Sequence, residues 1–289
     1  MSRWNMIVDV ARCENCHNCT LSVKDEHVDN DFPGYAAPMP LHGRNWIQIE
    51  RKVRGSGHAT DTAYLPTMCN HCDDAPCLKA GAEDGSVKKR NDGIVIIDPV
   101  KAKGRKDLVE CCPYGAISWN EELELPQIWI FDAHLLDKGW KEPRASHACP
   151  TQALEAVKIP DQQMAARAEA EGLRVLRPEL RTKPRIYYKN LGRFDQNFIA
   201  GSVVCVSGGV KDCVEGAHIS LFRDDAIIAT TVSDAFGDFK FDGLEVSSGT
   251  YRITATHEKA GQGEVRLSHK AESLVCEILL TQRPGCSAV

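Results

Sequence analysis

Two runs of three cysteines, followed by two Cys-Pro pairs, constrain this chain more than any other feature. In the first run, two residues separate each cysteine from the next. In the second run, two residues separate the first and second cysteines, and four residues separate the second and third. The eight residues are Cys13, Cys16 and Cys19, then Cys69, Cys72 and Cys77, and finally Cys112 and Cys149, each of the last two followed by proline. This spacing is typical of thiolate ligands to iron–sulfur clusters. Segments far apart in the sequence must therefore fold around shared metal centres.

The ligands can be assigned to clusters by the crossover rule of bacterial ferredoxins. In those proteins three cysteines of one run bind one cubane, and the fourth, which precedes a proline, binds the other. Pairing the outer motifs with each other, and the inner motifs with each other, predicts two complete sets. Cluster one would take Cys13, Cys16, Cys19 and Cys149, and cluster two would take Cys69, Cys72, Cys77 and Cys112. The sequence thus predicts two [4Fe–4S] clusters.

The cysteines that a four-cluster chain would add are also missing in complete sets. One set of positions holds Gly81, Ala102, Arg105 and Leu108, and the other holds Val23, Trp129, Asp132 and Ala145. Each site therefore has either all of its ligands or none, which indicates that two whole clusters were lost. We expect side chains to fill both sites, with Val23 and Trp129 in one. Leu108 and Arg105 would fill the other, where Arg105 needs an acceptor or solvent because an unpaired buried charge is costly.

Zinc is the main alternative to iron–sulfur. Pairs of the form Cys-x2-Cys also build zinc sites, but the two pairs of a zinc site usually lie close together in sequence. Here the interval between Cys16 and Cys69 is long, and each run carries a third cysteine. A disulfide framework is less favoured still, because a chain of 289 residues can form cores without one.

The other cysteines, and two histidines of the cluster loops, are expected to be structural. The cysteines outside the two sets are Cys111, Cys205, Cys213, Cys276 and Cys286. His17 and His71 lie inside the cysteine runs, where packing is preferred to tuning of the sulfurs. No Ser-His-Asp, Walker or dinucleotide-binding motif is convincing, so no catalytic residue is predicted.

Length, charge and the amino terminus limit the class of protein. The 289 residues suffice for two domains, and 43% hydrophobic content allows real cores. A net charge of −5 argues against a nucleic-acid surface. We see no signal-peptide core before the first predicted strand, residues 6–10, and no apolar run long enough to span a membrane. With 13 cysteines, these features indicate a reducing compartment, the cytoplasm.

The predicted fold class is α+β, with residues 1–185 forming a ferredoxin-like double cluster-binding domain. In this part, residues 93–99 are a predicted strand and 162–172 a predicted surface helix. Residues 186–199 form a connection, where Tyr187, Tyr188 and Lys189 look suited to docking a partner.

Residues 200–289 are predicted to form a small all-β domain. Seven alternating runs at intervals of roughly 8–12 residues predict an antiparallel sandwich or barrel. The expected strands are 202–207, 217–222, 226–232, 238–244, 250–257, 263–268 and 273–280. Residues 236–243 and 249–255 resemble prealbumin-type modules of Cna-B domains. The acidic residues Asp234, Asp238 and Asp242 are better explained by turn chemistry than by calcium.

The motifs together resemble the iron–sulfur β subunits of the dimethyl-sulfoxide-reductase class of molybdenum or tungsten enzymes. Within that class the likeness is to the small subunits of pyrogallol–phloroglucinol transhydroxylases. It covers nearly the whole chain, including the appended seven-strand domain, which generic electron-transfer β subunits lack. Besides the cysteine motifs it includes residues 25–27, 32–35, 49–51, 93–95, 112–115, 119–121, 133–136, 183–185 and 187–191. One departure is clear, because the family keeps ligands at Val23, Trp129, Asp132 and Ala145 and carries three clusters.

The resemblance implies a partner and a reaction. The partner would be a large subunit with molybdenum or tungsten on two pyranopterin guanine dinucleotides, in a heterodimer or a multiple of it. The family precedent is hydroxyl transfer or hydroxylation on polyhydroxylated benzenes, of the pyrogallol or resorcinol type, in anaerobic aromatic degradation. This chain would be the non-catalytic iron–sulfur subunit. The alternatives are an electron-transfer subunit of another molybdenum or tungsten oxidoreductase, and a structural companion whose clusters are redox-silent.

Overall fold

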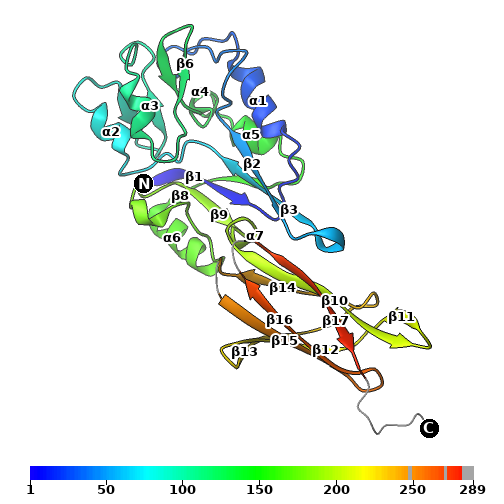
Figure 1. Ribbon diagram of the computed structural model, residues 1–289. Coiled ribbons are helices and arrows are strands. Elements are labelled where there is room, and N and C mark those ends of the chain that lie inside the picture. Colours follow the sequence, from blue (N-terminus) through cyan, green and yellow to red (C-terminus); the bar gives the residue numbers. More distant parts are fainter. Residues whose placement is uncertain (247–248, 270–271, 282–289) are drawn as a thin grey trace. The chain divides into compact units, whose positions relative to one another are not determined.

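The computed structural model describes residues 1–246, 249–269 and 272–281 of the chain (Figure 1). The chain separates into two compact units. The first comprises Met1–Arg51 and Tyr64–Leu191, and the second comprises Lys52–Ala63 and Gly192–Val289. Strands dominate both units and the helices are few and short. Cys286 lies outside the described residues.

A three-stranded sheet forms the base of the first unit. Its order is β8 (Leu154–Pro160), β1 (Ser2–Asp9) and β9 (Ile186–Lys189), with β8 antiparallel and β9 parallel to β1. The strand expected at residues 6–10 is therefore present but begins earlier. Tyr188 of β9 is fully buried and donates a hydrogen bond to the carbonyl oxygen of Pro66 at 3.1 Å. The prediction that Tyr188 serves a docking surface was wrong, because β9 turns this side chain into the core.

Short elements joined by loops make up the rest of the first unit. The expected helix at 162–172 is α6 (Asp161–Ala170), and the expected strand at 93–99 is β5 (Val95–Ile97). The other helices are α1 (Asn18–His27), α2 (Pro76–Ala80), α3 (Asp107–Cys111), α4 (Ala133–Leu136), α5 (Arg144–His147) and the 3-10 turn η2 (Pro178–Leu180). Two further pairs of antiparallel strands are β4 (Val87–Lys89) with β5, and β6 (Ser118–Asn120) with β7 (Leu125–Gln127).

The second unit is a sandwich of two four-stranded sheets. One contains β11 (Val210–Cys213), β10 (Asn197–Ser207), β14 (Asp238–Leu244) and β17 (Leu274–Leu280). The other has the order β13 (Ala226–Val232), β12 (His218–Arg223), β15 (Gly249–His257) and β16 (Gly261–His269). All seven expected strands are present, and β11 was missed. The expectation of a purely antiparallel fold was wrong, since β17 runs parallel to β10.

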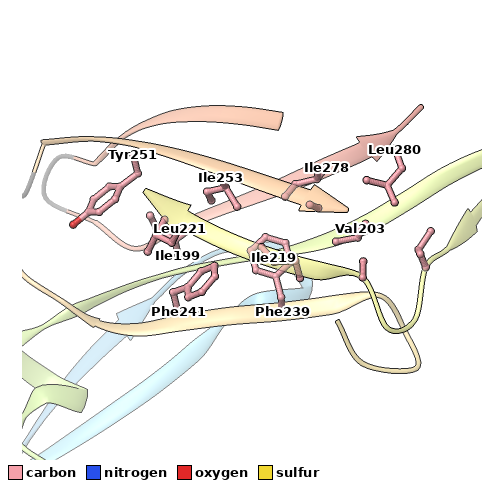
Figure 2. Close-up of a cluster of buried hydrophobic side chains, with 13 residues drawn as sticks. Ile199, Val203, Ile219, Leu221, Phe239, Phe241, Tyr251, Ile253, Ile278 and Leu280 are labelled. Carbon is pink, nitrogen blue, oxygen red and sulfur yellow. The ribbon is translucent and has the colours of Figure 1, made fainter. Parts of the chain in front are cut away.

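Alternating side chains build the core of the sandwich, which Figure 2 shows between the sheets. On β15 the buried residues are Tyr251, Ile253 and Ala255, each separated by a more exposed one. Gly201 of β10 allows the close approach of β17, since a Cβ there would lie 2.3 Å from the carbonyl oxygen of Cys276. Cys205 and Cys276 pack against this core, as predicted.

A hairpin tip from early in the sequence completes the second unit. Strands β2 (Gln48–Arg54) and β3 (Asp61–Thr67) pair, flanking the 3-10 turn η1 (Gly57–Ala59), and Lys52–Ala63 belong to the second unit with α7 (Gly192–Asp195). The buried guanidinium of Arg54 lies 2.6 Å from Asp61 and 3.3 Å from Asp242. The compact units therefore differ from the contiguous division predicted near residue 200.

We expect Asp61 to make the second unit sensitive to acid. Burial alone would raise the pKa of this carboxyl, but hydrogen bonds from Arg54 and Arg193 outweigh it and lower the pKa to about 2. A depressed carboxyl pKa stabilises the fold above the unfolded value of about 4, and this contribution is lost as the pH falls towards 2. Hydrogen exchange of the 192–246 peptides, measured in mild denaturant across that pH range, should show the loss. Asp61→Asn should flatten the pH dependence, and an unchanged slope would contradict this account.

Candidate iron–sulfur centres

The second cysteine set lines one cavity of the first unit. Cys69 and Cys72 lie in the loop after β3, Cys77 lies in the first turn of α2, and Cys112 directly follows α3. All four cysteines line the same cavity, whose apolar wall includes Val95, Ile97, Ile117 and Ile128. The structure therefore brings together four thiols that are separated by up to 43 positions in sequence, from 69 to 112.

Without a metal these four thiols are hard to ionise, because burial and their neighbours disfavour the thiolate charge. Burial raises the pKa of Cys72 to about 11 and that of Cys77 to about 12, with a further rise from the charge of Cys112. The pKa of Cys69 is raised well above its usual range by burial and then by Cys112 and Cys77. Mutual repulsion of this kind is relieved when a cationic iron core binds the thiolates, so the donor set fits a cubane. Within the described ranges, no three His, Cys, Asp or Glu side chains converge tightly enough to share one metal ion. Cubane ligands have no such requirement, because each binds a different iron.

The first cysteine set lies around the start of α1. Cys13 and Cys16 occupy the loop after β1, Cys19 lies in the first turn of α1, and Cys149 follows α5. Burial raises the pKa of Cys19 to about 11, and the charges of Cys13 and Cys149 raise it further. Cys16 is exposed, whereas Cys69, Cys72, Cys77 and Cys112 are not. Cys149 lies near Cys13 and Cys19, and Cys112 lies near Cys69, Cys72 and Cys77. This grouping is the one that the nested assignment requires, and cluster binding by each set stays a prediction.

Each Cys-Pro cysteine accepts a hydrogen bond from the backbone four residues later. The N–H of Ala116 donates to the Sγ of Cys112 at 3.4 Å, and that of Ala153 donates to the Sγ of Cys149 at 3.2 Å. Proline in the intervening turn has no N–H of its own. Hydrogen bonds to ligand sulfurs are one of the factors that set cluster potentials. The two motifs therefore present their thiolates in the same way.

The loop histidines differ in role from each other. His17 is exposed and holds the left-handed conformation, φ 61°, immediately before α1. His71 is buried, and its Nδ1 accepts a hydrogen bond from the Val95 N–H at 3.1 Å. Burial, with help from Lys89 and Arg185, lowers the pKa of His71 to about 3, so the ring is neutral. An acceptor Nδ1 cannot donate to the sulfur of Cys69, while the buried Nε2 has no hydrogen-bond partner among the described residues. The preference for packing over tuning at His71 stays a prediction.

A buried aromatic and polar group fills one vacated set, meaning one of the two sets of four positions where the expected cysteines are missing. Val23, Trp129, Asp132 and Ala145 are each at most 1% exposed. Asp132 accepts hydrogen bonds from the indole N–H of Trp129 at 3.2 Å and from the backbone N–H of Arg144 at 2.8 Å. The ring of His27, also fully buried, lies 3.2 Å from the same carboxylate. Filling by side chains was predicted, but the carboxylate-centred network was not.

The other vacated set has collapsed. Ala102 and Leu108 are fully buried. Arg105 donates to the carbonyl oxygen of Ala80 at 3.0 Å and pairs with Asp107 at 2.8 Å and with Asp84. The expectation that Arg105 must find an acceptor is confirmed. A Cβ on Gly81 would lie 2.7 Å from the backbone nitrogen of Val87, so a cysteine no longer fits there.

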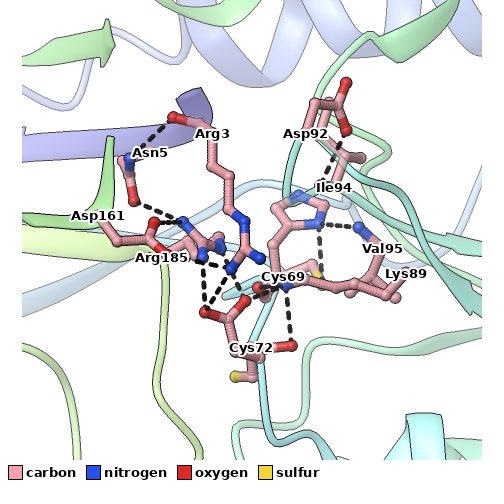
Figure 3. A network of polar contacts seen from close by, with 12 residues as sticks. Arg3, Asn5, Cys69, Cys72, Lys89, Asp92, Ile94, Val95, Asp161 and Arg185 are labelled. Atoms are coloured by element: carbon pink, nitrogen blue, oxygen red, sulfur yellow. Dashed lines mark hydrogen bonds and ion pairs between the residues drawn. The ribbon is translucent and has the colours of Figure 1, made fainter. Parts of the chain in front are cut away.

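Charged residues that lie against the Cys69–Cys72 loop were not recognised from the sequence. Figure 3 shows Lys89 and Arg185 beside Cys69 and Cys72. Arg185 is 4% exposed and binds the carboxylate of Asp73 through two nitrogens, at 2.6 and 2.8 Å. The backbone N–H of Arg185 also donates to the carbonyl oxygen of Asn70 at 2.9 Å. Only the parallel pairing of β9 with β1 brings residue 185 here, so no local spacing signals the contact.

Comparison with known proteins identifies the family. Residues 60–159 match the model of the 4Fe-4S dicluster domain. The pyrogallol hydroxytransferase small subunit of Pelobacter acidigallici is 45% identical over 258 residues, 88% of this chain and 92% of that protein. A tetrathionate reductase subunit of Salmonella typhimurium is 31% identical over 193 residues, covering 65% of this chain and 73% of that protein. A sulfite dehydrogenase subunit of Allochromatium vinosum is 28% identical over 204 residues, covering 65% of this chain and 83% of that protein.

The chain belongs to the iron–sulfur electron-transfer subunits of the dimethyl-sulfoxide-reductase class of molybdopterin oxidoreductases, in the family of the pyrogallol hydroxytransferase small subunit. Among solved structures, the minor pilin GBS52 of Streptococcus agalactiae is 14% identical with a TM-score of 0.24, covering 37% of this chain and 54% of its own. That likeness is too low to bear on the Cna-B resemblance, which stays a prediction. In the described part of the chain, no helix has the length and apolarity that a membrane crossing requires.

Proposed function

We propose that this chain binds two [4Fe–4S] clusters and serves a large catalytic subunit that transfers hydroxyl groups on polyhydroxylated benzenes. Cys13, Cys16, Cys19 and Cys149 would hold cluster one, and Cys69, Cys72, Cys77 and Cys112 would hold cluster two. The observation that carries the substrate class is the 45% identity with a pyrogallol hydroxytransferase small subunit, which extends over 92% of that protein. The iron cores would supply one-electron redox chemistry.

The residues of this chain position the metal and shape its surroundings. The two loops and the two Cys-Pro turns fix the thiolates, and backbone N–H groups of Ala116 and Ala153 donate to the ligand sulfurs. Apolar side chains such as Val95 and Ile128 shield cluster two from water. The reaction itself belongs to the partner, with molybdenum or tungsten on two pyranopterin guanine dinucleotides. We place the complex in the cytoplasm, because the free thiols favour a reducing compartment.

Co-expression of this chain with a large molybdopterin subunit of the pyrogallol hydroxytransferase type tests the proposal. We expect an isolated heterodimer, or a multiple of it, with roughly eight irons in this chain by the four-thiolate rule. The complex should convert pyrogallol-type phenols by hydroxyl transfer or hydroxylation, whereas the isolated chain should convert none.

Redox titration of the complex separates the alternatives. Clusters that are reduced and reoxidised reversibly support electron transfer, and clusters that stay oxidised under strong reductant would favour a structural companion. Turnover of an inorganic sulfur compound without any turnover of phenols would instead favour another oxidoreductase of the class. About twelve or sixteen irons per chain, the content of three or four cubanes, would contradict the cluster assignment.

A further inference from the structure

The strand β4 places one lysine underneath the loop that carries two ligands of cluster two. The Nζ of Lys89 donates to the carbonyl oxygen of His71 at 2.6 Å and to that of Cys72 at 3.1 Å. Its side chain is 21% exposed, so solvent screens the charge only in part. The ammonium therefore binds the inner face of the Cys69–Cys72 loop through the peptide groups of two of its residues.

The charge of Lys89 is not cancelled by its neighbour. Lys89 lies 2.7 Å from Asp73, but this carboxylate is already held by the guanidinium of Arg185 through two hydrogen bonds. Arg185 is itself shared with Asp161 at 3.1 Å. Arg3 joins the same group, 3.1 Å from Asp161 and 3.7 Å from Asp73. Three cations and two carboxylates thus leave an excess of positive charge beside the loop (Figure 3). The charge lies close to the ligand set, because the Nζ of Lys89 binds the backbone carbonyl oxygen of Cys72 itself.

We propose that Lys89 raises the reduction potential of cluster two by stabilising its reduced state. The inference rests on the proposed function, since it requires a cluster on Cys69, Cys72, Cys77 and Cys112. On reduction the cluster gains one electron and one unit of negative charge, and no bond or proton changes at Lys89. A fixed cation nearby favours that added charge, and local charge is a known determinant of cluster potentials.

One ligand of cluster one has a carboxylate as its neighbour. The charge of Glu14 acts on Cys13, and an anion there disfavours further negative charge. Burial of cluster two disfavours its reduction. Lys89 raises the potential of cluster two relative to a variant without this charge, whichever of the two clusters has the higher potential. Lys89 is a positioning and tuning residue: it contacts the loop carbonyls and acts on the cluster through space.

A potentiometric titration of the complex, followed by electron paramagnetic resonance, tests this role. Lys89→Met should move one of the two midpoints to a more negative potential and leave the other unchanged. At fixed ambient potential the ratio of reduced to oxidised cluster should fall about tenfold, the change that 59 mV produces in a one-electron couple. Lys89→Arg, which keeps the charge, should restore most of the native potential.

Lys88 offers a matched control on the same strand. It is exposed and lies 4.0 Å from Asp98, so Lys88→Met removes the same charge one residue away without touching the cysteine loop. Equal shifts in Lys88→Met and Lys89→Met would overturn the proposal, as would an unmoved midpoint in a Lys89→Met complex that retains its iron.

Lys89→Gln keeps a donor for the loop carbonyls without the charge. Loss of cluster two from both neutral variants but not from Lys89→Arg would assign Lys89 to loop folding and also overturn tuning. Native clusters that cannot be reduced would instead count against the proposed function.

Discussion

Replacement of Cys149 by alanine is expected to remove cluster one and to leave cluster two in place. The thiol lies 130 positions after Cys19 in sequence, yet the charges of Cys13 and Cys149 both act on Cys19. A cubane bound by three thiolates is labile, so the iron content of the chain should fall from roughly eight to roughly four. Iron analysis and the electron paramagnetic resonance of the reduced complex measure this loss.

Two adjacent cysteines provide the control for this experiment. Cys112→Ala should remove the other cluster, because Cys112 shares its cavity with Cys69, Cys72 and Cys77. Cys111 is the neighbouring residue at the end of α3 and does not line that cavity. Cys111→Ala should therefore keep all the iron. If Cys149→Ala disturbed only the cluster of Cys69, Cys72 and Cys77, the nested assignment would be wrong.

Restoring four cysteines at one vacated set should create a third cluster. Val23, Trp129, Asp132 and Ala145 are buried together, and α1 packs against α5. Replacing all four by cysteine removes the indole ring of Trp129 and the carboxylate of Asp132, which opens space for a cubane. We expect about twelve irons per chain in place of about eight, and a third reducible cluster. Loss of Asp132 leaves His27 without that partner, which should cost about 1–3 kcal/mol of stability before iron binds.

The second vacated set is the control, since its backbone has closed. The variant with cysteines at Gly81, Ala102, Arg105 and Leu108 should stay near eight irons. A side chain at Gly81 would meet the Val87 backbone nitrogen at 2.7 Å and the Ser86 hydroxyl at 2.8 Å. The account would be contradicted if this variant gained a cluster, or if the first variant failed to gain one. The packing at these positions would then not predict which set can hold a cluster.

The chemistry of this protein could be predicted from its sequence because metal ligands are few in type and regular in spacing. The intervals within Cys13–Cys19 and Cys69–Cys77, and the proline after Cys112 and Cys149, are local features that thiolate geometry requires. The strands of the second unit were predictable for a similar reason: alternation of buried and exposed residues, as on β15, is a period-two pattern within one segment. Strand β11 was not predicted, because every one of its residues, from Val210 to Cys213, is exposed and no alternation of buried and exposed residues marks it.

Only the tertiary structure decided the contacts between distant segments. Tyr187, Tyr188 and Lys189 suggest a docking surface in sequence, but the register of β9 with β1 buries Tyr188. The same parallel pairing brings Arg185 to Asp73, where Lys89 also contacts the cysteine loop. Likewise Arg54 pairs with Asp242 across 188 positions, so the tip of an early hairpin joins the second unit. Sequence spacing encodes what one segment can do by itself, whereas the partner of a charged side chain depends on which strands meet, and that is determined by packing of the whole unit.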